Sequence, residues 1–149
     1  MAEWWGTEEQ IRLAKALRPR ILQMYDEVLT YTRLALEHDG NQEGLQVIHE
    51  LRRYVDEEIR PSTYTGAWIH QRGGVKSPVS AARILLFYYV EIIHEGKEMD
   101  GQVIKERKKR IALIQDRMRE VARFLKDAKE RGIVVDEAYF KAMLQKKMV

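Results

Sequence analysis

The feature that most constrains the fold is an apolar stretch from Val79 to Glu95. Twelve of its seventeen residues are apolar or aromatic, and Arg83 and Glu91 are the charged residues that interrupt it before its end. A helix that is apolar around most of its circumference has to be covered by neighbours on several sides. We therefore expect residues 79–95 to form the buried central helix of an all-α bundle.

The rest of the chain is typical of amphipathic helices separated by turns, and strand patterns are nearly absent. The further helices are predicted at residues 8–17, 19–38, 43–59, 102–131 and from Asp136 onward. Pro19 either kinks the first helix or starts the second one. Residues 102–131 form the longest helix, which is basic and carries a heptad seam of apolar residues. The prediction is a bundle of five to six helices.

A chain of 149 residues has the size of one domain, and its 45% hydrophobic content is enough for a core. We expect a single helical domain over residues 1–149, with 1–6 as an N-terminal arm and 60–78 as a long basic loop. No apolar run is long enough to span a membrane, and no signal peptide is recognisable. The absence of cysteine excludes disulfides and thiolate sites. These features favour the cytoplasm as a location.

The amino-acid usage is typical of a thermophile. Asn occurs once, Glu outnumbers Asp by 16 to 7, and a third of the chain is charged. Enrichment in charged residues with few thermolabile ones is the pattern of proteins from hyperthermophiles.

The small net charge of +3 conceals a separation of charge along the chain. Residues 1–60 carry a net charge of −4, residues 61–83 carry +3 and residues 101–131 carry +6. Basic charge concentrated in two segments favours a polyanionic partner such as nucleic acid. An ordinary solvated basic helix is the alternative.

The long loop and its flanks are the first candidate site. Its chemistry-bearing residues are Arg60, Tyr64, Trp68, His70, Gln71, Arg72, Gly73, Gly74, Lys76 and Arg83. Backbone amides around the glycines and at the start of the following helix could bind phosphate, and Trp68 could stack on a base. In the alternative, Trp68 and Ile69 fold back on the bundle and the loop is only a connection.

Clusters of cations on two helices are the second candidate. The long helix carries Lys105, Arg107, Lys108, Lys109 and Arg110, continued by Arg117, Arg119, Arg123 and Lys126, and a smaller cluster comprises Arg12, Lys15, Arg18 and Arg20. The cations of the long helix are spread over several faces and could straddle a phosphate backbone. Alternatively, they pair within the chain with Asp116, Glu120 and Asp127.

A Glu-x-x-His pair and a pair of N-terminal tryptophans are two further features of the sequence. Glu91 and His94 form a Glu-x-x-His pair, which is half of a di-iron bundle site, but the sequence holds no second copy. We therefore predict no metal and no cofactor, and no nucleophile–histidine–acid constellation points to an enzyme. Trp4 and Trp5 precede the first helix and are predicted to contact a neighbouring subunit, with docking on the chain's own bundle as the alternative.

A small, cysteine-free, basic helical chain with a basic helix over Arg12–Arg20, a break at Pro19 and a bundle from Glu43 to Leu144 resembles the coat proteins of filamentous viruses of hyperthermophilic archaea. The resemblance covers the whole chain at the level of architecture. It implies a structural protein that self-assembles and wraps linear double-stranded DNA, commonly with a related partner chain, and a location in the virion. The alternatives are a helical adaptor or small subunit of a nucleoprotein complex, and a metal-binding bundle.

Overall fold

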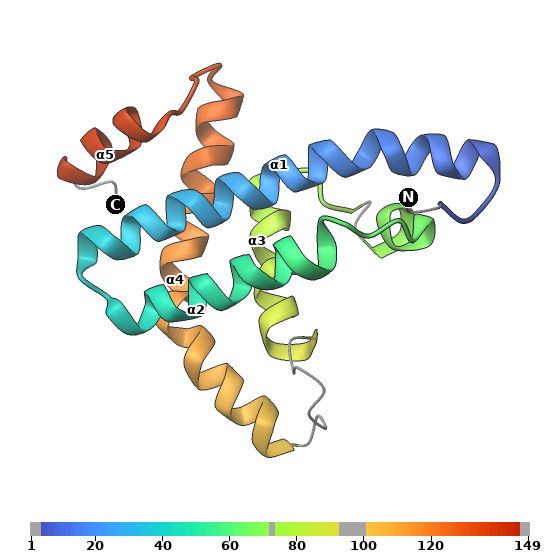
Figure 1. Cartoon of the computed structure of the whole chain (residues 1–149). Helices are drawn as coiled ribbons and strands as arrows, with labels where there is room; N and C mark the ends of the chain where they lie inside the picture. The colour runs from blue at the N-terminus through green and yellow to red at the C-terminus, as the bar shows by residue number, and fades with distance from the viewer. Residues whose placement is uncertain (1–3, 72–73, 93–100, 147–149) are drawn as a thin grey trace.

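The computed structural model of the chain describes residues 4–71, 74–92 and 101–146 (Figure 1). Every regular element within these residues is helical, which confirms the predicted all-α bundle. In chain order the elements are α1 (Glu8–Asp39), α2 (Gln42–Tyr54), η1 (Val55–Ile59), η2 (Ala67–Gln71), α3 (Pro78–Phe87), η3 (Tyr88–Ile92), α4 (Gly101–Glu130) and α5 (Glu137–Gln145), where η marks five residues of π-helix. No helix in the described part of the chain combines the length and the apolar character needed to span a bilayer.

Helix α1 is one continuous helix with Pro19 inside it, so the alternative in which Pro19 starts a second helix was wrong. Thr7 and Gln10 form the expected capping box at its start, and Gly40 ends it with a left-handed φ of 69°. Pro19 lies on the exposed side, while Ala14 and Ile21 are both fully buried on the inner side. The continuous inner stripe stabilises the helix across the proline.

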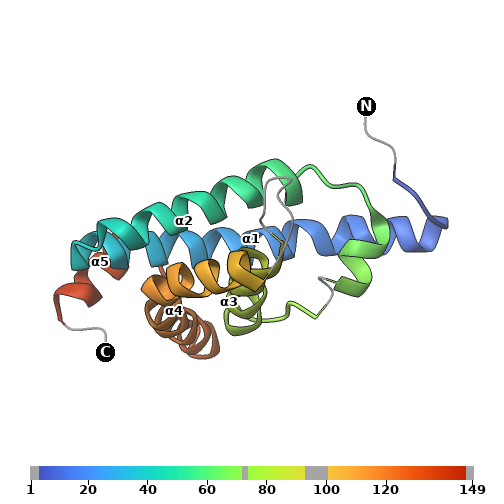
Figure 2. The same cartoon turned by 90° about the horizontal axis from the view of Figure 1, so that it is seen from below.

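Helix α1 also occupies the central position that was predicted for residues 79–95. It packs against α2, α3, α4, α5 and η2, whereas the main packing partners of α3 are α1 and α4, apart from its own continuation η3 (Figures 1 and 2). Ala81 and Leu85 of α3 are buried, but Arg83 is exposed and Phe87 is 50% exposed on the opposite side. The apolar stretch therefore lies at the outside of the bundle with one face uncovered. Its last residues, 93–95, lie outside the described part.

Helix α4 follows its predicted seam. Ile111, Ile114, Met118, Val121 and Leu125 are all buried. At its far end the chain turns back, and α5 packs on the second half of α1 through the rings of Tyr31 and Phe140, whose centroids are 4.9 Å apart. The Tyr31 hydroxyl also donates a hydrogen bond of 3.1 Å to the Val135 carbonyl.

Replacing Pro19 with alanine is expected to stabilise the protein by about 2 kcal/mol. The substitution restores an amide hydrogen bond and removes the clash of the ring with the Lys15 carbonyl, worth roughly 3 kcal/mol in a helix interior, against about 1 kcal/mol of extra unfolded-state entropy. The melting temperature should rise by about 4–8 °C in a thermal melt. Gln23→Ala, at another exposed position of α1, serves as control. An unchanged or lower melting temperature for Pro19→Ala would show that the helix depends on the proline ring.

Candidate nucleic-acid interface

A groove runs between α3 and α4 on the outer side of the bundle. It consists of two adjoining cavities of about 300 and 410 Å³, and Arg83, Leu86 and Arg119 line both of them. Early residues of α3 lie opposite late residues of α4, as expected for antiparallel neighbours. We call this feature the cationic groove; it is lined by Val79, Ala82, Arg83, Leu86, Phe87, Val90 and Glu91 on one side and Lys108, Ile111, Gln115, Arg119, Ala122 and Arg123 on the other.

Four cations and one carboxylate line the groove: Arg83, Lys108, Arg119, Arg123 and Glu91. At about 100° per residue, the three cations of α4 lie within roughly 60° of one another around the helix, although they are spread over four turns. None of the four cations has an ion-pair partner within 4.0 Å among the described residues. Arg119 donates to Gln115 once the amide of Gln115 is oriented to accept. This face of the molecule therefore presents positive charge that no described residue neutralises through an ion pair.

The cationic groove is also lined by apolar residues, which we call its apolar floor: Val79, Ala82, Leu86, Phe87, Val90, Ile111 and Ala122. We call its four cations the rim. Phe87 is half-exposed and has no ring contact with another described aromatic side chain. The groove thus combines a positively charged rim with an uncovered apolar surface.

The local sequence explains why α3 presents this face. Ser77 and Ser80 form a capping box, and Pro78 fixes the first turn. Ala81 and Leu85 are buried in the core, which leaves Arg83 and Phe87 exposed on the other side of the helix and Leu86 half-buried. On α4 the heptad seam turns inward in the same way, which leaves Arg119 and Arg123 beside it.

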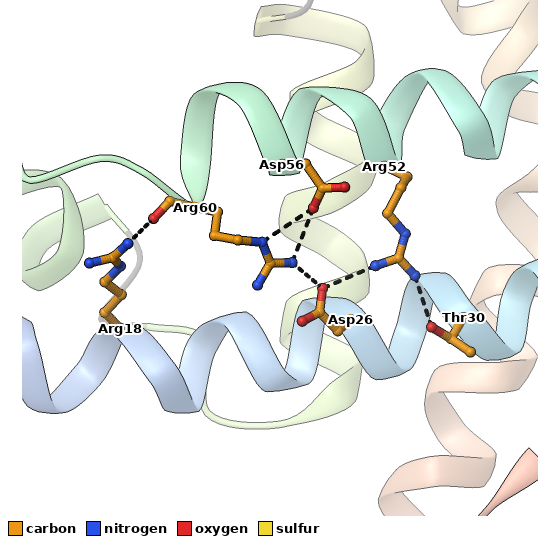
Figure 3. Close-up of polar contacts among 6 residues, drawn as sticks. All are labelled: Arg18, Asp26, Thr30, Arg52, Asp56 and Arg60. Carbon is orange, nitrogen blue, oxygen red and sulfur yellow. Dashed lines mark hydrogen bonds and ion pairs between the residues drawn. The ribbon is translucent and has the colours of Figure 1, made fainter.

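The predicted role of Arg60 in nucleic-acid binding does not fit the structure (Figure 3). Its guanidinium is 2.6 Å from the Asp26 carboxylate and 3.1 Å from that of Asp56, and the hydrogen bond with Asp26 raises the pKa of Arg60. Arg52 of α2 donates hydrogen bonds to the Asp26 carboxylate and to the Thr30 hydroxyl. Arg18 donates to the carbonyl of Arg60. These contacts join α1 to α2 and η1, because the Asp26 carboxylate of α1 forms ion pairs with both Arg52 and Arg60.

Several predicted cations of α4 are also engaged within the chain. Arg117 is only 16% exposed in its side chain and pairs with Asp39 at 3.0 Å and Glu120 at 3.3 Å. Arg110 pairs with Glu50, to which the Tyr89 hydroxyl also donates, and burial raises the pKa of Tyr89 to about 12. Arg107 donates to the Tyr89 carbonyl at 3.2 Å. For Arg117 and Arg110 the alternative of ion pairing within the chain is confirmed, although the partners differ in part from those predicted.

In the long loop the alternative is confirmed for Trp68 and Ile69, which pack on the bundle. Trp68 is fully buried and donates a hydrogen bond of 2.9 Å to the Ser62 carbonyl, so its ring is not available for a base. Of the predicted phosphate-binding amides, that of Ser80 donates to the Ser77 hydroxyl, and the amides of Lys76 and Ser77 donate to the Ser80 hydroxyl. Lys76 itself is exposed. Arg72 lies outside the described residues.

At the N-terminus the two tryptophans have different environments. Trp4 is half-buried against the bundle, with Lys15 and Arg18 at 6.0 and 5.8 Å from its ring centroid, so for Trp4 the docking alternative is confirmed. Trp5 is 71% exposed. Arg12 and Arg20 are exposed on α1 without a described ion-pair partner, away from the groove.

Of the cations in the predicted clusters, Arg83, Lys108, Arg119 and Arg123 line the groove. Lys105 and Lys109 are exposed elsewhere on the first turns of α4. Arg119 and Arg123 were recognised as part of the basic helix but not connected to Arg83, because the order of packing between α3 and α4 decides which cations meet. In the sequence, the spacing of four residues between Arg119 and Arg123 indicates that the two side chains share one face of the helix.

No group of three or more acidic, histidine or cysteine side chains within the described residues is arranged to hold a metal ion. Glu91 lies in the groove, and His94 lies outside the described part of the chain. Comparisons with protein-family models, with curated proteins and with solved structures found no match for this chain. The groove is therefore interpreted from its own chemistry.

Proposed function

We propose that this protein binds nucleic acid through phosphate contacts in the cationic groove, as a structural subunit rather than an enzyme. The observation that carries the proposal is the set of four cations on one face with a single carboxylate and no ion-pair partner among the described residues. Such cations cost free energy through mutual repulsion unless an anion binds them. The phosphate backbone is a polyanion with closely and regularly spaced charges, which suits a row of cations.

The length of the row supports a polymeric ligand. Lys108 and Arg123 lie about 22 Å apart along α4 at 1.5 Å per residue. A single phosphate or a small carboxylate would contact one or two of these cations, whereas a nucleic-acid strand can contact all of them. No helix-turn-helix pair presents a polar recognition helix within the described residues, so contacts to phosphate are expected to dominate over contacts to base edges.

Double-stranded DNA in the coat of a filamentous archaeal virus is the more specific form of this proposal, and it rests on the sequence resemblance. A helical adaptor in a nucleoprotein complex uses the same groove without self-assembly. Both forms require the electrostatic binding described above, and they differ in whether the protein oligomerises on the nucleic acid.

A salt titration tests the proposal. Binding of the full chain to fluorescent oligonucleotides is measured by anisotropy at increasing salt. If all four groove cations contact phosphates, the plot of log affinity against log salt should have a slope of about −3 to −4, from roughly 0.9 counterions per contact on duplex DNA and 0.7 on a single strand. Competition between unrelated sequences of equal length should show little preference. A slope near zero, or the absence of binding at low salt, would contradict the proposal.

Self-assembly is favoured by a second observation. Trp5 is 71% exposed, and Tyr64 and Leu13 are 63% and 47% exposed. A Cβ at Gly6 would lie 3.6 Å from the Thr65 side chain, so the segment carrying Trp5 lies against the one carrying Tyr64. Large apolar groups exposed at one end of a molecule commonly mark a contact with another protein chain.

Replacing Trp5 with serine is therefore expected to reduce self-association while leaving the fold intact. Its side chain is largely exposed in the single chain. The free energy of unfolding should therefore change by less than about half a kcal/mol, as is usual for surface substitutions. Sedimentation velocity over a range of concentrations measures the association. Val134→Ser removes another exposed apolar side chain, which is 88% exposed at the opposite end, and serves as control. An unchanged distribution of species for Trp5→Ser would remove Trp5 from the interface.

A further inference from the structure

The apolar floor of the cationic groove is not explained by contacts to phosphate alone. Duplex DNA carries its phosphates on the outside and keeps its bases stacked within, so a duplex lying across the groove would contact the rim. Val79, Leu86 and Phe87 would then remain uncovered. A ligand that fills the groove has to be anionic along one edge and apolar in its body.

We propose that the groove binds a single-stranded segment of nucleic acid, with phosphates on the cations and one or more unstacked bases on the apolar floor against Phe87. This inference rests on the proposed phosphate binding. It replaces the double-stranded form, which rests on the sequence resemblance alone, with a single strand as the nucleic acid that the groove takes. Charge complementarity argues for this occupant, because four cations lie opposite one carboxylate.

Phe87 has the properties of a stacking residue. It lies at the last position of α3, its side chain is half-exposed, and it lines the larger cavity of about 410 Å³ together with Lys108. Each base has an apolar face that can stack on an aromatic ring, and this contact does not depend on sequence. The neighbouring Arg83 and Lys108 can hold the phosphates on either side of a stacked base.

The two cavities have a size suited to such a segment. Volumes of about 300 and 410 Å³ lie at the lower end of the range for pockets that enclose small ligands. Arg83 and Arg119 lie at the junction of the cavities. A phosphate at this junction would leave room for a base on each side, which is the alternation of charge and ring that a single strand provides.

The test compares one labelled oligothymidine of about 12 nucleotides, which has little structure of its own, with a duplex of equal length. The full chain is expected to bind the single strand at least tenfold more tightly at the same salt concentration. Phe87→Ala should weaken single-strand binding by about five- to a hundredfold, the usual effect of losing one stacked base, and should change duplex binding by less than twofold. Phe87→Leu retains apolar contact without an aromatic face and should show most of the loss.

Tyr139→Ala, at an aromatic position that is 36% exposed and outside the groove, is the control and should not affect binding. Circular dichroism confirms that each variant is folded. Polyglutamate is the competitor that carries charge without bases, and it should displace the oligonucleotide only at a large excess of charge. Equal binding of single strand and duplex, an unaffected Phe87→Ala variant, or efficient competition by polyglutamate would overturn the inference. If one of these results came with a steep salt dependence of binding, the proposed phosphate binding would stand and only the single-strand inference would fail. If binding did not depend on salt, the inference and the proposed function would both fail.

Discussion

Replacing Arg83, Arg119 and Arg123 together with glutamate is expected to lower the affinity for single-stranded nucleic acid more than about 100-fold at 0.1 M salt. Loss of three phosphate contacts removes about 2.1 from the salt slope on a single strand, which corresponds to roughly 130-fold between 1 M and 0.1 M salt. The three new carboxylates add repulsion. All three arginines lie on the rim of the groove, without an ion pair to another described residue, so the fold should not depend on them.

The matched control carries the same change in net charge at another place. Arg12, Arg20 and Lys76 are exposed, have no described ion-pair partner and lie outside the groove. Their replacement with glutamate should reduce affinity less than about tenfold, because charges beyond a Debye length of roughly 10 Å are largely screened at this salt concentration. Both variants are measured by anisotropy at several salt concentrations.

The comparison also decides between two locations for the interface. Arg12, Arg20 and Lys76 were predicted to bind nucleic acid from the sequence, whereas the structure separates them from the groove. Equal losses in the two variants would indicate binding by general charge, and a larger loss in the control would move the interface to the N-terminal half of α1.

The helical fold could be predicted because its determinants are local. The capping boxes at Thr7 and Ser77, the stop at Gly40 and the seam of α4 all act within a few residues. The centre of the bundle could not be predicted in this way. Residues 79–95 are the most apolar stretch, but α1 is longer and is contacted by helices on several sides. The apolar residues of α3 that do not face α1 line the groove instead of packing in the core.

The site was predicted only in part for a related reason. The sequence identifies cations but not which of them have partners, and partners here come from distant residues: Asp26 for Arg60, Asp39 for Arg117 and Glu50 for Arg110. Tertiary packing also determines that Arg83 lies opposite Arg119. The sequence also left the position of Trp68 open between a base contact and burial. Its burial depends on the Ser62 carbonyl and on α1, and the composition of the loop does not show where these lie.

Leu85→Asp is expected to abolish folding, whereas Leu86→Asp should leave a folded protein. Leu85 is fully buried in the core, so an aspartate there would be an unpaired buried carboxylate, at a cost of several kcal/mol added to a loss of about 2–5 kcal/mol of apolar packing. That sum is comparable to the whole stability of a domain of this size, about 5–15 kcal/mol. Circular dichroism and thermal melts measure the difference.

Leu86 is the neighbouring residue, with the same chemistry and a different environment. Its side chain is half-buried and lines the groove next to Arg83 and Arg119, where a carboxylate can remain hydrated and be attracted by two cations. We expect Leu86→Asp to cost about 1–2 kcal/mol, within the usual range for single substitutions. The new negative charge should also weaken nucleic-acid binding by cancelling one cation of the rim. If both variants unfold, the outer face of α3 is covered in the native protein, and an open groove between α3 and α4 is contradicted together with the function derived from it.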